Sequence, residues 1–186
     1  MIPARVVLNW EFTLYPVSVQ SSEILAGLLR RPIMNITAWN SLLFKHVPEL
    51  YELQQVRTKF QNMKGFFLTC RLAKTEPFFP DFIDRHHYLD SIQLYTLLDL
   101  IDLHEGTLLP SLHELKAKCE YHIRNTCKLC QNKGFFCELC KLNKIIYPFD
   151  ANTTTCTGCM SVFHISCFSN AKCCPKCTRV AVKTHL

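Results

Sequence analysis

The sequence predicts a mainly α-helical body followed by a cysteine-rich module with small β hairpins. Only 5 of the 186 residues are glycine, below the usual share of about 7%, and this favours helices over a turn-rich β fold. In the first half of the chain, apolar residues recur at steps of three or four, which is the helical period. Ten of the 12 cysteines fall between Cys127 and Cys177. We therefore expect a helical body at 1–118, a cysteine-rich module at 119–180 and a tail at 181–186.

Two elements are expected before the first long helix. Residues 4–12 are expected to be extended, because their apolar side chains alternate at period two. A helix is expected to follow, since Ser21 or Ser22 can cap its first turn and Pro32 ends it.

A long amphipathic helix is expected from Val47 to about Cys70. Pro48 suits its first turn, where the backbone N–H has no helical partner. The steps between apolar residues are all three or four, which indicates one buried stripe. The stripe comprises Val47, Leu50, Leu53, Val56, Phe60, Met63, Phe67 and Cys70.

Two more helices are expected before the cysteine pairs begin. Thr96 and Asp99 have the spacing of a capping box, and Gly106 can end the helix that they start. A further helix from about Ser111 to Asn125 leads into the first cysteine pair.

The cysteine pattern indicates zinc. A Cys-x-x-Cys turn brings two thiolates to one ion, and a tetrahedral zinc site needs two such pairs. The start of the chain is a poor signal peptide and we expect an intracellular protein, where such pairs hold metal more often than they form disulfides. The pairs are Cys127/Cys130, Cys137/Cys140, Cys156/Cys159, His164/Cys167 and Cys174/Cys177.

The first pair needs partners from outside the regular series. His122 lies close in sequence, and Cys119 precedes it by three residues on one helical face. These two residues with Cys127 and Cys130 could close a third zinc site, so about three Zn²⁺ ions per chain are expected. Cys173 is interpreted as a spare neighbour of Cys174 that could replace it.

The spacing from Cys137 onward resembles the interleaved arrangement of PHD and phorbol-ester/diacylglycerol-type zinc fingers. That resemblance implies a cross-braced module with two zinc ions, although the spacing alone also permits two sequential sites. The implied ligand sets are Cys137, Cys140, His164 and Cys167 for one ion, and Cys156, Cys159, Cys174 and Cys177 for the other.

Four protein ligands per ion leave no open position, so the expected zinc sites are structural and no catalytic residue is assigned. Zinc-bound thiolates would lower the formal charge of +6 by about 4. Lys and Arg are also dispersed, which argues against nucleic-acid binding. No apolar run reaches the length of a transmembrane segment.

Several motifs occur in a fixed order over nearly the whole chain: Ile2–Val7, Trp10–Phe12, Thr69-Cys70-Arg71, His122, Cys127–Cys140, Tyr147-Pro148-Phe149, Phe163–Cys167 and Cys174–Cys177. Together these motifs resemble the Rubicon homology domain. Within that family, Asp84-Arg85-His86 and Asp102-Leu103-His104 are most similar to the differentially-expressed-in-FDCP (DEF) branch, with the pleckstrin-homology-domain family M adaptors, Rubicon and Pacer as alternatives.

The resemblance implies a non-enzymatic adaptor domain at late endosomes, lysosomes and autophagosomes. The implied partners are a GTP-loaded late-endosomal Rab GTPase and a family M adaptor, and the implied role is regulation of lysosome positioning. Relatives commonly have a further cysteine cluster before the Ile2-Pro3 segment, so the chain is expected to be a fragment, an alternative product or a minimal member.

Two other functions share features with this sequence. A diacylglycerol- or phosphoinositide-binding zinc finger would use an apolar tip made of Phe135, Phe136, Ile145, Ile146 and Phe149. A RING-type ubiquitin ligase also has cross-braced zinc, but the four residues between Cys159 and His164 do not fit the RING order. The chain has no Gly-rich phosphate loop and no nucleophile elbow.

Overall fold

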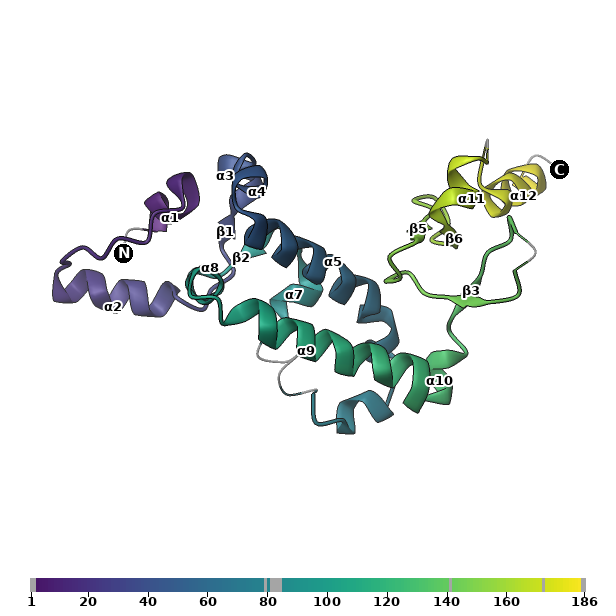
Figure 1. The fold of residues 1–186 in the computed structure, drawn as a ribbon, viewed down its shortest axis with the longest axis horizontal. Coiled ribbons are helices and arrows are strands. Elements are labelled where there is room, and N and C mark those ends of the chain that lie inside the picture. Colours follow the sequence, from purple (N-terminus) through teal and green to yellow (C-terminus); the bar gives the residue numbers. More distant parts are fainter. Residues whose placement is uncertain (1–2, 79, 81–84, 141, 172, 185–186) are drawn as a thin grey trace. The chain divides into compact units, whose positions relative to one another are not determined.

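The structure is a computed structural model that describes residues 3–78, 80, 85–140, 142–171 and 173–184. It is mainly helical with small antiparallel strand pairs, as the sequence predicts (Figure 1). The chain forms two compact units. Unit 1 consists of residues 1–61 and 75–120, and unit 2 of residues 62–74 and 121–186. The expected division after residue 118 stays a prediction.

Unit 1 is built from helices and one short strand pair, in which Met34 pairs with Tyr95 and Asn35 with Leu94. Its elements are α1 (Pro3–Asn9), α2 (Val19–Leu28), β1 (Met34–Asn35), α3 (Ile36–Asn40), α4 (Leu43–His46), most of α5 (Pro48–Leu68), α7 (His87–Asp90), β2 (Leu94–Tyr95), α8 (Leu97–His104) and α9 (Leu108–Tyr121) to Glu120.

The expectation of an extended segment at residues 4–12 is wrong, because this segment begins with helix α1. Val6 and Val7 are neighbours in sequence and both are fully buried, so the period-two pattern does not separate a buried face from an exposed one here. The helix is closed by the hydrogen bond from the Trp10 N–H to the Val6 carbonyl, and Trp10 takes a left-handed conformation with φ of 56°.

Helix α2 begins earlier than expected. Ser18, rather than Ser21 or Ser22, is the N-cap, and its side chain accepts a hydrogen bond from the Ser21 N–H. The apolar pattern in this helix does not mark a buried face, since none of its described residues is buried. Val19 and Ile24 are 77% and 63% exposed.

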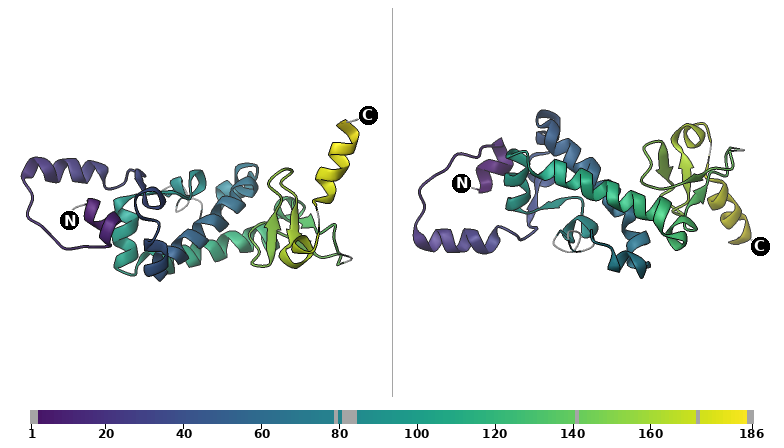
Figure 2. Two further views of the ribbon diagram at one scale, coloured as in Figure 1. Left: turned by 90° about the horizontal axis from the view of Figure 1, so that it is seen from above. Right: turned by 60° about the horizontal axis from the view of Figure 1, so that its bottom comes forward.

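Helix α5 confirms the expected long helix. Its apolar stripe is buried from Leu50 to Phe67, and Cys70 follows two residues after the helix ends at Leu68. In unit 1, α5 runs beside α9, where the His113 ring lies 2.8 Å from a Glu52 carboxylate oxygen (Figure 2).

The next two expected helices are also present. Thr96 and Asp99 form the capping box of α8, and after this helix Gly106 adopts a φ of +76° that favours glycine. Helix α9 begins at Leu108, earlier than expected, and α-helical geometry ends at Tyr121. Residues His122–Thr126 form a short π-helix, η2.

Asp99 is the centre of a buried polar network in unit 1. Its carboxylate accepts hydrogen bonds from the Tyr88 hydroxyl at 2.6 Å and from Arg85 at 2.7 Å, and it lies 2.8 Å from His87 Nε2. Burial opposes ionisation of Asp99, but the hydrogen bond and charge of His87, with the Tyr88 bond, lower its pKa to about 2. The network ties α7 to the start of α8. Asp84, which precedes this segment, lies outside the described residues.

Arg57 is the largest fully buried side chain of α5. Its guanidinium lies over the rings of Tyr88 and Tyr95, at 4.5 and 4.1 Å from their centroids. It donates to the carbonyls of Ser91 and Leu94 at 2.5 and 2.6 Å. Cation–π contacts and charge-assisted hydrogen bonds therefore compensate part of the cost of burying this charge.

Unit 2 joins the last turns of α5 to the C-terminal part of the chain. Asn62 donates to the Pro148 carbonyl at 2.9 Å, and the Phe66 ring lies 5.9 Å from Tyr147 and 5.8 Å from Phe149. The remaining elements are η1 (Leu72–Thr75) up to Lys74, η2 (His122–Thr126), α10 (Lys128–Gln131), β3 (Phe135–Phe136), β4 (Ile145–Ile146), β5 (Thr153–Thr155), β6 (Val162–His164), α11 (Ile165–Ser169) and α12 (Pro175–Thr184).

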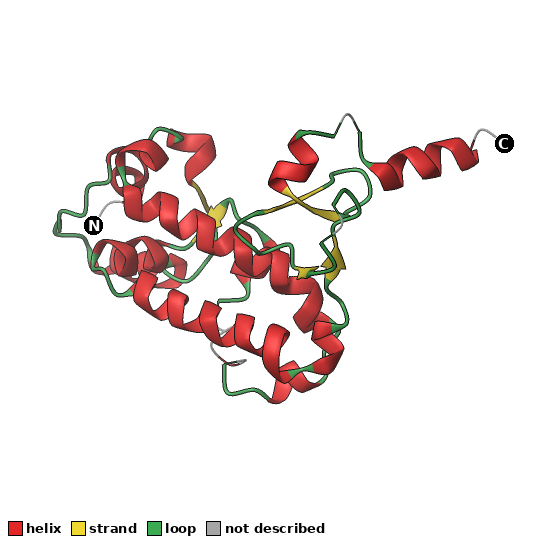
Figure 3. Ribbon diagram, turned by 45° about the vertical axis from the view of Figure 1, so that its right-hand side comes forward, coloured by secondary structure: helices red, strands yellow, loops and turns green. Residues whose placement is uncertain are grey.

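The strands of unit 2 form two short antiparallel pairs (Figure 3). In the β3–β4 pair, Phe135 faces Ile146 and Phe136 faces Ile145, and in the β5–β6 pair Thr154 faces Phe163. The core around them is small, and half of its buried residues are cysteines: Cys137, Ile146, Cys156, Val162, Phe163 and Cys174. So small an apolar core suggests that the cysteines contribute to stability through more than packing.

Among the described residues, the structure contains no helix with the length and apolar character needed to span a bilayer.

Candidate metal centres

Three groups of four side chains bring ligand atoms together in unit 2, and within each group all ligand atoms lie within 4.8 Å of one another. All 12 cysteines are described, and all are free thiols. Each group has the number and type of ligands that a structural zinc site requires.

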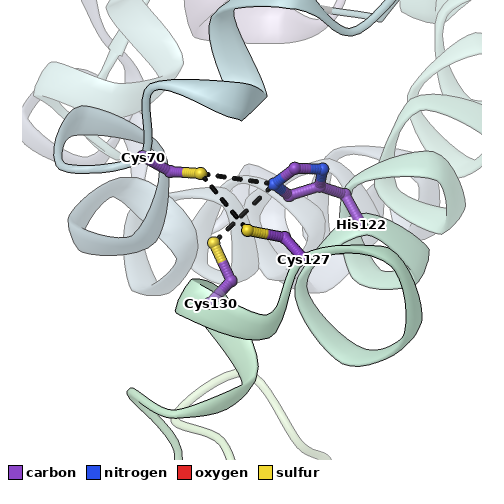
Figure 4. Close-up of side chains that lie close together, drawn as sticks. All are labelled: Cys70, His122, Cys127 and Cys130. Atoms are coloured by element: carbon purple, nitrogen blue, oxygen red, sulfur yellow. Dashed lines mark hydrogen bonds between the residues drawn. The ribbon is translucent and has the colours of Figure 1, made fainter.

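The first cluster consists of Cys70, His122, Cys127 and Cys130, all buried. Their sulfur and nitrogen atoms point toward one another (Figure 4). Cys70 Sγ lies 3.6 Å from both His122 Nε2 and Cys127 Sγ, and Cys130 Sγ lies 3.7 Å from His122 Nε2.

The local backbone explains how these side chains converge. The chain leaves α5 at Leu68, so Cys70 lies at the end of the helix and not on its face. The π-helix η2 carries His122, and the Cys127 N–H closes it on the His122 carbonyl. Cys127 then precedes α10, whose first turn returns Cys130 to the same point. Short π-helical turns are often found at functional sites, since they change the register of a helix.

Cys119 is not in the first cluster, and Cys70 takes the expected position. Within the described residues, Cys119 belongs to none of the three groups. It continues the buried stripe of α9 after Leu108, Leu112 and Leu115, at helical steps of three and four. Burial raises the pKa of its thiol, which disfavours the thiolate that binds metal.

Sequence reasoning missed Cys70 because this residue completes the apolar stripe of α5 and therefore resembles a core position. Its partners follow more than fifty residues later. Its presence in the Thr69-Cys70-Arg71 motif was the available signal.

The second and third clusters interleave along the chain. The second contains Cys137, Cys140, His164 and Cys167, and the third contains Cys156, Cys159, Cys174 and Cys177. The geometry therefore groups the Cys137/Cys140 pair with His164/Cys167, and the Cys156/Cys159 pair with Cys174/Cys177, as in a cross-brace. The alternative of sequential grouping does not match these positions.

Distances within these clusters are similar to those in the first. His164 Nδ1 lies 3.4 Å from Cys140 Sγ and 3.9 Å from Cys167 Sγ. Cys156 Sγ lies 3.7 Å from Cys177 Sγ, and Cys159 Sγ lies 3.5 Å from Cys174 Sγ.

Cys173 is exposed and stays outside the third cluster. The Thr178 hydroxyl donates to its sulfur at 3.3 Å. The structure thus brings Cys174, rather than Cys173, to the ligand position.

The electrostatics of the clusters favour some thiolates and oppose others. Hydrogen bonds from the Ser161 hydroxyl and backbone lower the pKa of Cys159 to about 6. Hydrogen bonds to Cys159 and Cys156 raise the pKa of Cys177 to about 12. Four thiols this close cannot all carry charge without a cation among them.

The expected apolar tip is divided by the fold. Phe136 and Ile145 face each other across the β3–β4 pair and are 56% and 41% exposed. Ile146 and Phe149 are buried, at 3% and 2% exposed, and Phe135 is half-buried. Arg124 covers Phe149, with its guanidinium carbon 5.0 Å from the ring centroid, and also pairs with Asp150.

Comparison with known proteins finds similarity along nearly the whole chain. Residues 1–182 match the Rubicon Homology Domain family. The chain is 35% identical over 180 residues to human Pleckstrin homology domain-containing family M member 3, covering 96% of this chain and 24% of that protein. It is 35% identical over 192 residues to the Caenorhabditis elegans Differentially expressed in FDCP 8 homolog, covering 100% of this chain and 40% of that protein.

A third relative is the human Protein associated with UVRAG as autophagy enhancer, 32% identical over 187 residues, covering 100% of this chain and 28% of that protein. The chain thus spans less than half the length of each of these relatives.

Proposed function

This chain belongs to the Rubicon homology domain family, and from that premise we propose that it is a non-enzymatic, zinc-containing adaptor domain of autophagic and endolysosomal traffic. It binds a late-endosomal Rab GTPase in the GTP-loaded state, or a family M adaptor with a pleckstrin homology domain. It acts on the cytoplasmic side of late endosomes and lysosomes and regulates lysosome positioning. The observation that carries the proposal is the convergence of three complete four-ligand sets in unit 2.

The ligand sets fit tetrahedral zinc. Zn–S bonds of about 2.3 Å place two thiolate sulfurs about 3.8 Å apart at tetrahedral angles. The Cys70–Cys127 and Cys156–Cys177 sulfur distances of 3.6 and 3.7 Å agree with this geometry. Three cysteines with one histidine are typical of structural zinc, as are four cysteines.

We assign the ligands by cluster. Cys70, His122, Cys127 and Cys130 hold the first zinc; Cys137, Cys140, His164 and Cys167 hold the second; Cys156, Cys159, Cys174 and Cys177 hold the third. When bound, zinc supplies cross-links between segments that the small apolar core of unit 2 does not join on its own.

The adaptor role rests on the ligand count and on the relatives. Each set offers four protein ligands, and catalytic zinc normally has three protein ligands and a water. The names of the three relatives describe domain content, expression or autophagy enhancement, and none describes a reaction.

Retention of the purified chain on immobilised late-endosomal Rab tests the partner. We expect more binding to Rab loaded with a GTP analogue than to Rab loaded with GDP. Removing a ligand of the second cluster by His164→Ala should abolish it, because unit 2 would lose its fold. Equal binding to both nucleotide states, or none with all three zinc ions present, would reject the GTPase partner.

Lipid binding is the second candidate, and the exposed Phe136–Ile145 pair favours it. Co-sedimentation with vesicles that contain diacylglycerol or a phosphoinositide should then exceed that with phosphatidylcholine alone. Phe136→Ser should remove the difference without changing zinc content. Equal sedimentation with all vesicles would reject lipid binding.

A further inference from the structure

Unit 2 has an open cleft whose lining includes none of the proposed zinc ligands. Its volume is about 590 Å³, within the range of sites that bind small ligands or a few side chains. Its lining comes from β3 and the residues around it, from β6 and from the first turns of α12.

The lining is apolar at its centre. Val162 and Phe163 are almost fully buried, while Phe136 on β3 and Val180 on α12 are 56% and 53% exposed. Two apolar side chains from different elements therefore line the cleft and remain exposed to solvent. Such side chains are available to an apolar group that enters it.

The rim of the cleft has an excess of positive charge. Lys176, Arg179 and Val180 lie on one face of α12, at relative positions i, i+3 and i+4. Arg179 pairs with Glu138 across the rim at 2.7 Å, and both side chains are largely exposed. Lys176 is exposed and has no carboxylate partner among the residues that the structure describes. The Arg179–Glu138 pair is neutral overall, so the net positive charge of the lining comes from Lys176, and this charge favours an anionic ligand.

We propose that this cleft binds a short acidic peptide segment of a partner protein, with an apolar or aromatic side chain as its anchor. A bilayer surface suits a convex apolar tip rather than a hollow. A second copy of this chain that docked through its own α12 would bring the same basic face and would be repelled. A peptide can place its anchor against the exposed Phe136 and Val180 side chains and a carboxylate beside Lys176.

The proposal goes beyond binding of a GTPase, and a peptide selection on the full zinc-loaded chain tests it. Random displayed peptides of about twelve residues are selected on the chain, and an enriched sequence is labelled with fluorescein for polarisation measurements. We expect enrichment of Asp and Glu around one Leu, Ile, Phe or Trp. Replacing the acids of that peptide by amides should weaken binding, and raised salt should weaken it further.

Matched variants locate the site. Phe136→Ser should weaken binding by about tenfold or more, and Lys176→Glu by about fivefold. Leu68→Ser and Lys74→Glu alter residues of the same unit that are exposed and do not line the cleft, so they should leave binding unchanged. Zinc content and the thermal midpoint show whether each variant is folded.

Three results would overturn the proposal. The first is no acidic enrichment, or enriched peptides whose affinity is the same for Phe136→Ser, Lys176→Glu and the control variants. The second is a surface that binds anionic vesicles through these two residues and selects no peptide. The third is a concentration-dependent dimer that Lys176→Glu or Phe136→Ser dissociates. The GTPase measurement is separate, so loss of one activity does not decide the other.

Discussion

Replacing each of two isolated cysteines by serine in turn tests which of them completes the first cluster. Cys70 and Cys119 are both buried, at 1% and 0% exposed, so Cys→Ser is a comparable change of size at both positions. Only Cys70 has its sulfur among the other ligand atoms, at 3.6 Å from Cys127 Sγ. Cys70→Ser should lower the zinc content from about three to about two ions per chain, because three ligands no longer close a tetrahedral site.

Cys119→Ser should cost stability without loss of metal. Burying a hydroxyl in the apolar stripe of α9 costs about 1–3 kcal/mol, which corresponds to a midpoint lower by roughly 2–12 °C for a chain of this size. Cys173→Ser serves as the control, since Cys173 is exposed and lies outside the clusters. Cys173→Ser should change neither the zinc content nor the thermal midpoint.

Native mass spectrometry of the three variants counts zinc, and calorimetry measures the midpoint. If Cys119→Ser lost one zinc ion while Cys70→Ser retained all of them, the first cluster would be wrong. If both variants lost one ion, both thiols would be needed for zinc binding. The distinction drawn from the position of Cys70 Sγ among the ligand atoms would then be wrong.

Three more predictions concern metal, pH and backbone. Excess chelator should make unit 2 sensitive to protease, because half of the buried residues in the core around its strands are cysteines of the proposed zinc sites; resistance that survives complete zinc removal would contradict this. Asp99 has a pKa lowered from 3.8 to about 2, so its stabilisation is present above about pH 4 and is lost as the pH falls toward 2. Asp99→Asn should therefore cost about 2 kcal/mol at neutral pH and flatten the acid dependence in denaturant titrations; an unchanged acid dependence would refute the assignment. Gly134→Ala should destabilise by about 1–2 kcal/mol, since the added Cβ would lie 2.1 Å from an Ile145 methyl group. Gly65→Ala, which meets nothing within 4 Å, should stabilise by about 0.5–1 kcal/mol, and equal midpoints for these two variants would contradict the packing argument.

Local signals were enough to predict the long helices. The stripe of α5 and the capping box of Thr96 and Asp99 depend on residues within one or two turns, and the structure confirms both. The short helix α1 could not be predicted in this way. A single pair of turns shows little periodicity, and packing of Val6 and Val7 decided its conformation.

The candidate metal ligands likewise divide into those that local spacing predicts and one that it does not. The pairs from Cys127 to Cys177 are close in sequence, so their spacing was informative. The fourth position of the first cluster required a choice between a neighbour and a distant residue. Helical spacing favoured Cys119, but that spacing is also what places Cys119 in the core of unit 1 beside Leu115. Cys70 is brought to the cluster by tertiary structure, which local patterns do not report.

The position of Cys70 has a consequence for how the chain can fold. A metal held by Cys70 and by residues 122–130 closes a loop around the segment 71–121, which contains α7, α8 and α9. A covalent link of that span would remove roughly 4 kcal/mol of entropy from the unfolded chain, and a tightly held ion acts in the same direction. During synthesis, this loop cannot close before His122 has left the ribosome, so α7, α8 and α9 are all made before the ligand set of the first cluster is complete.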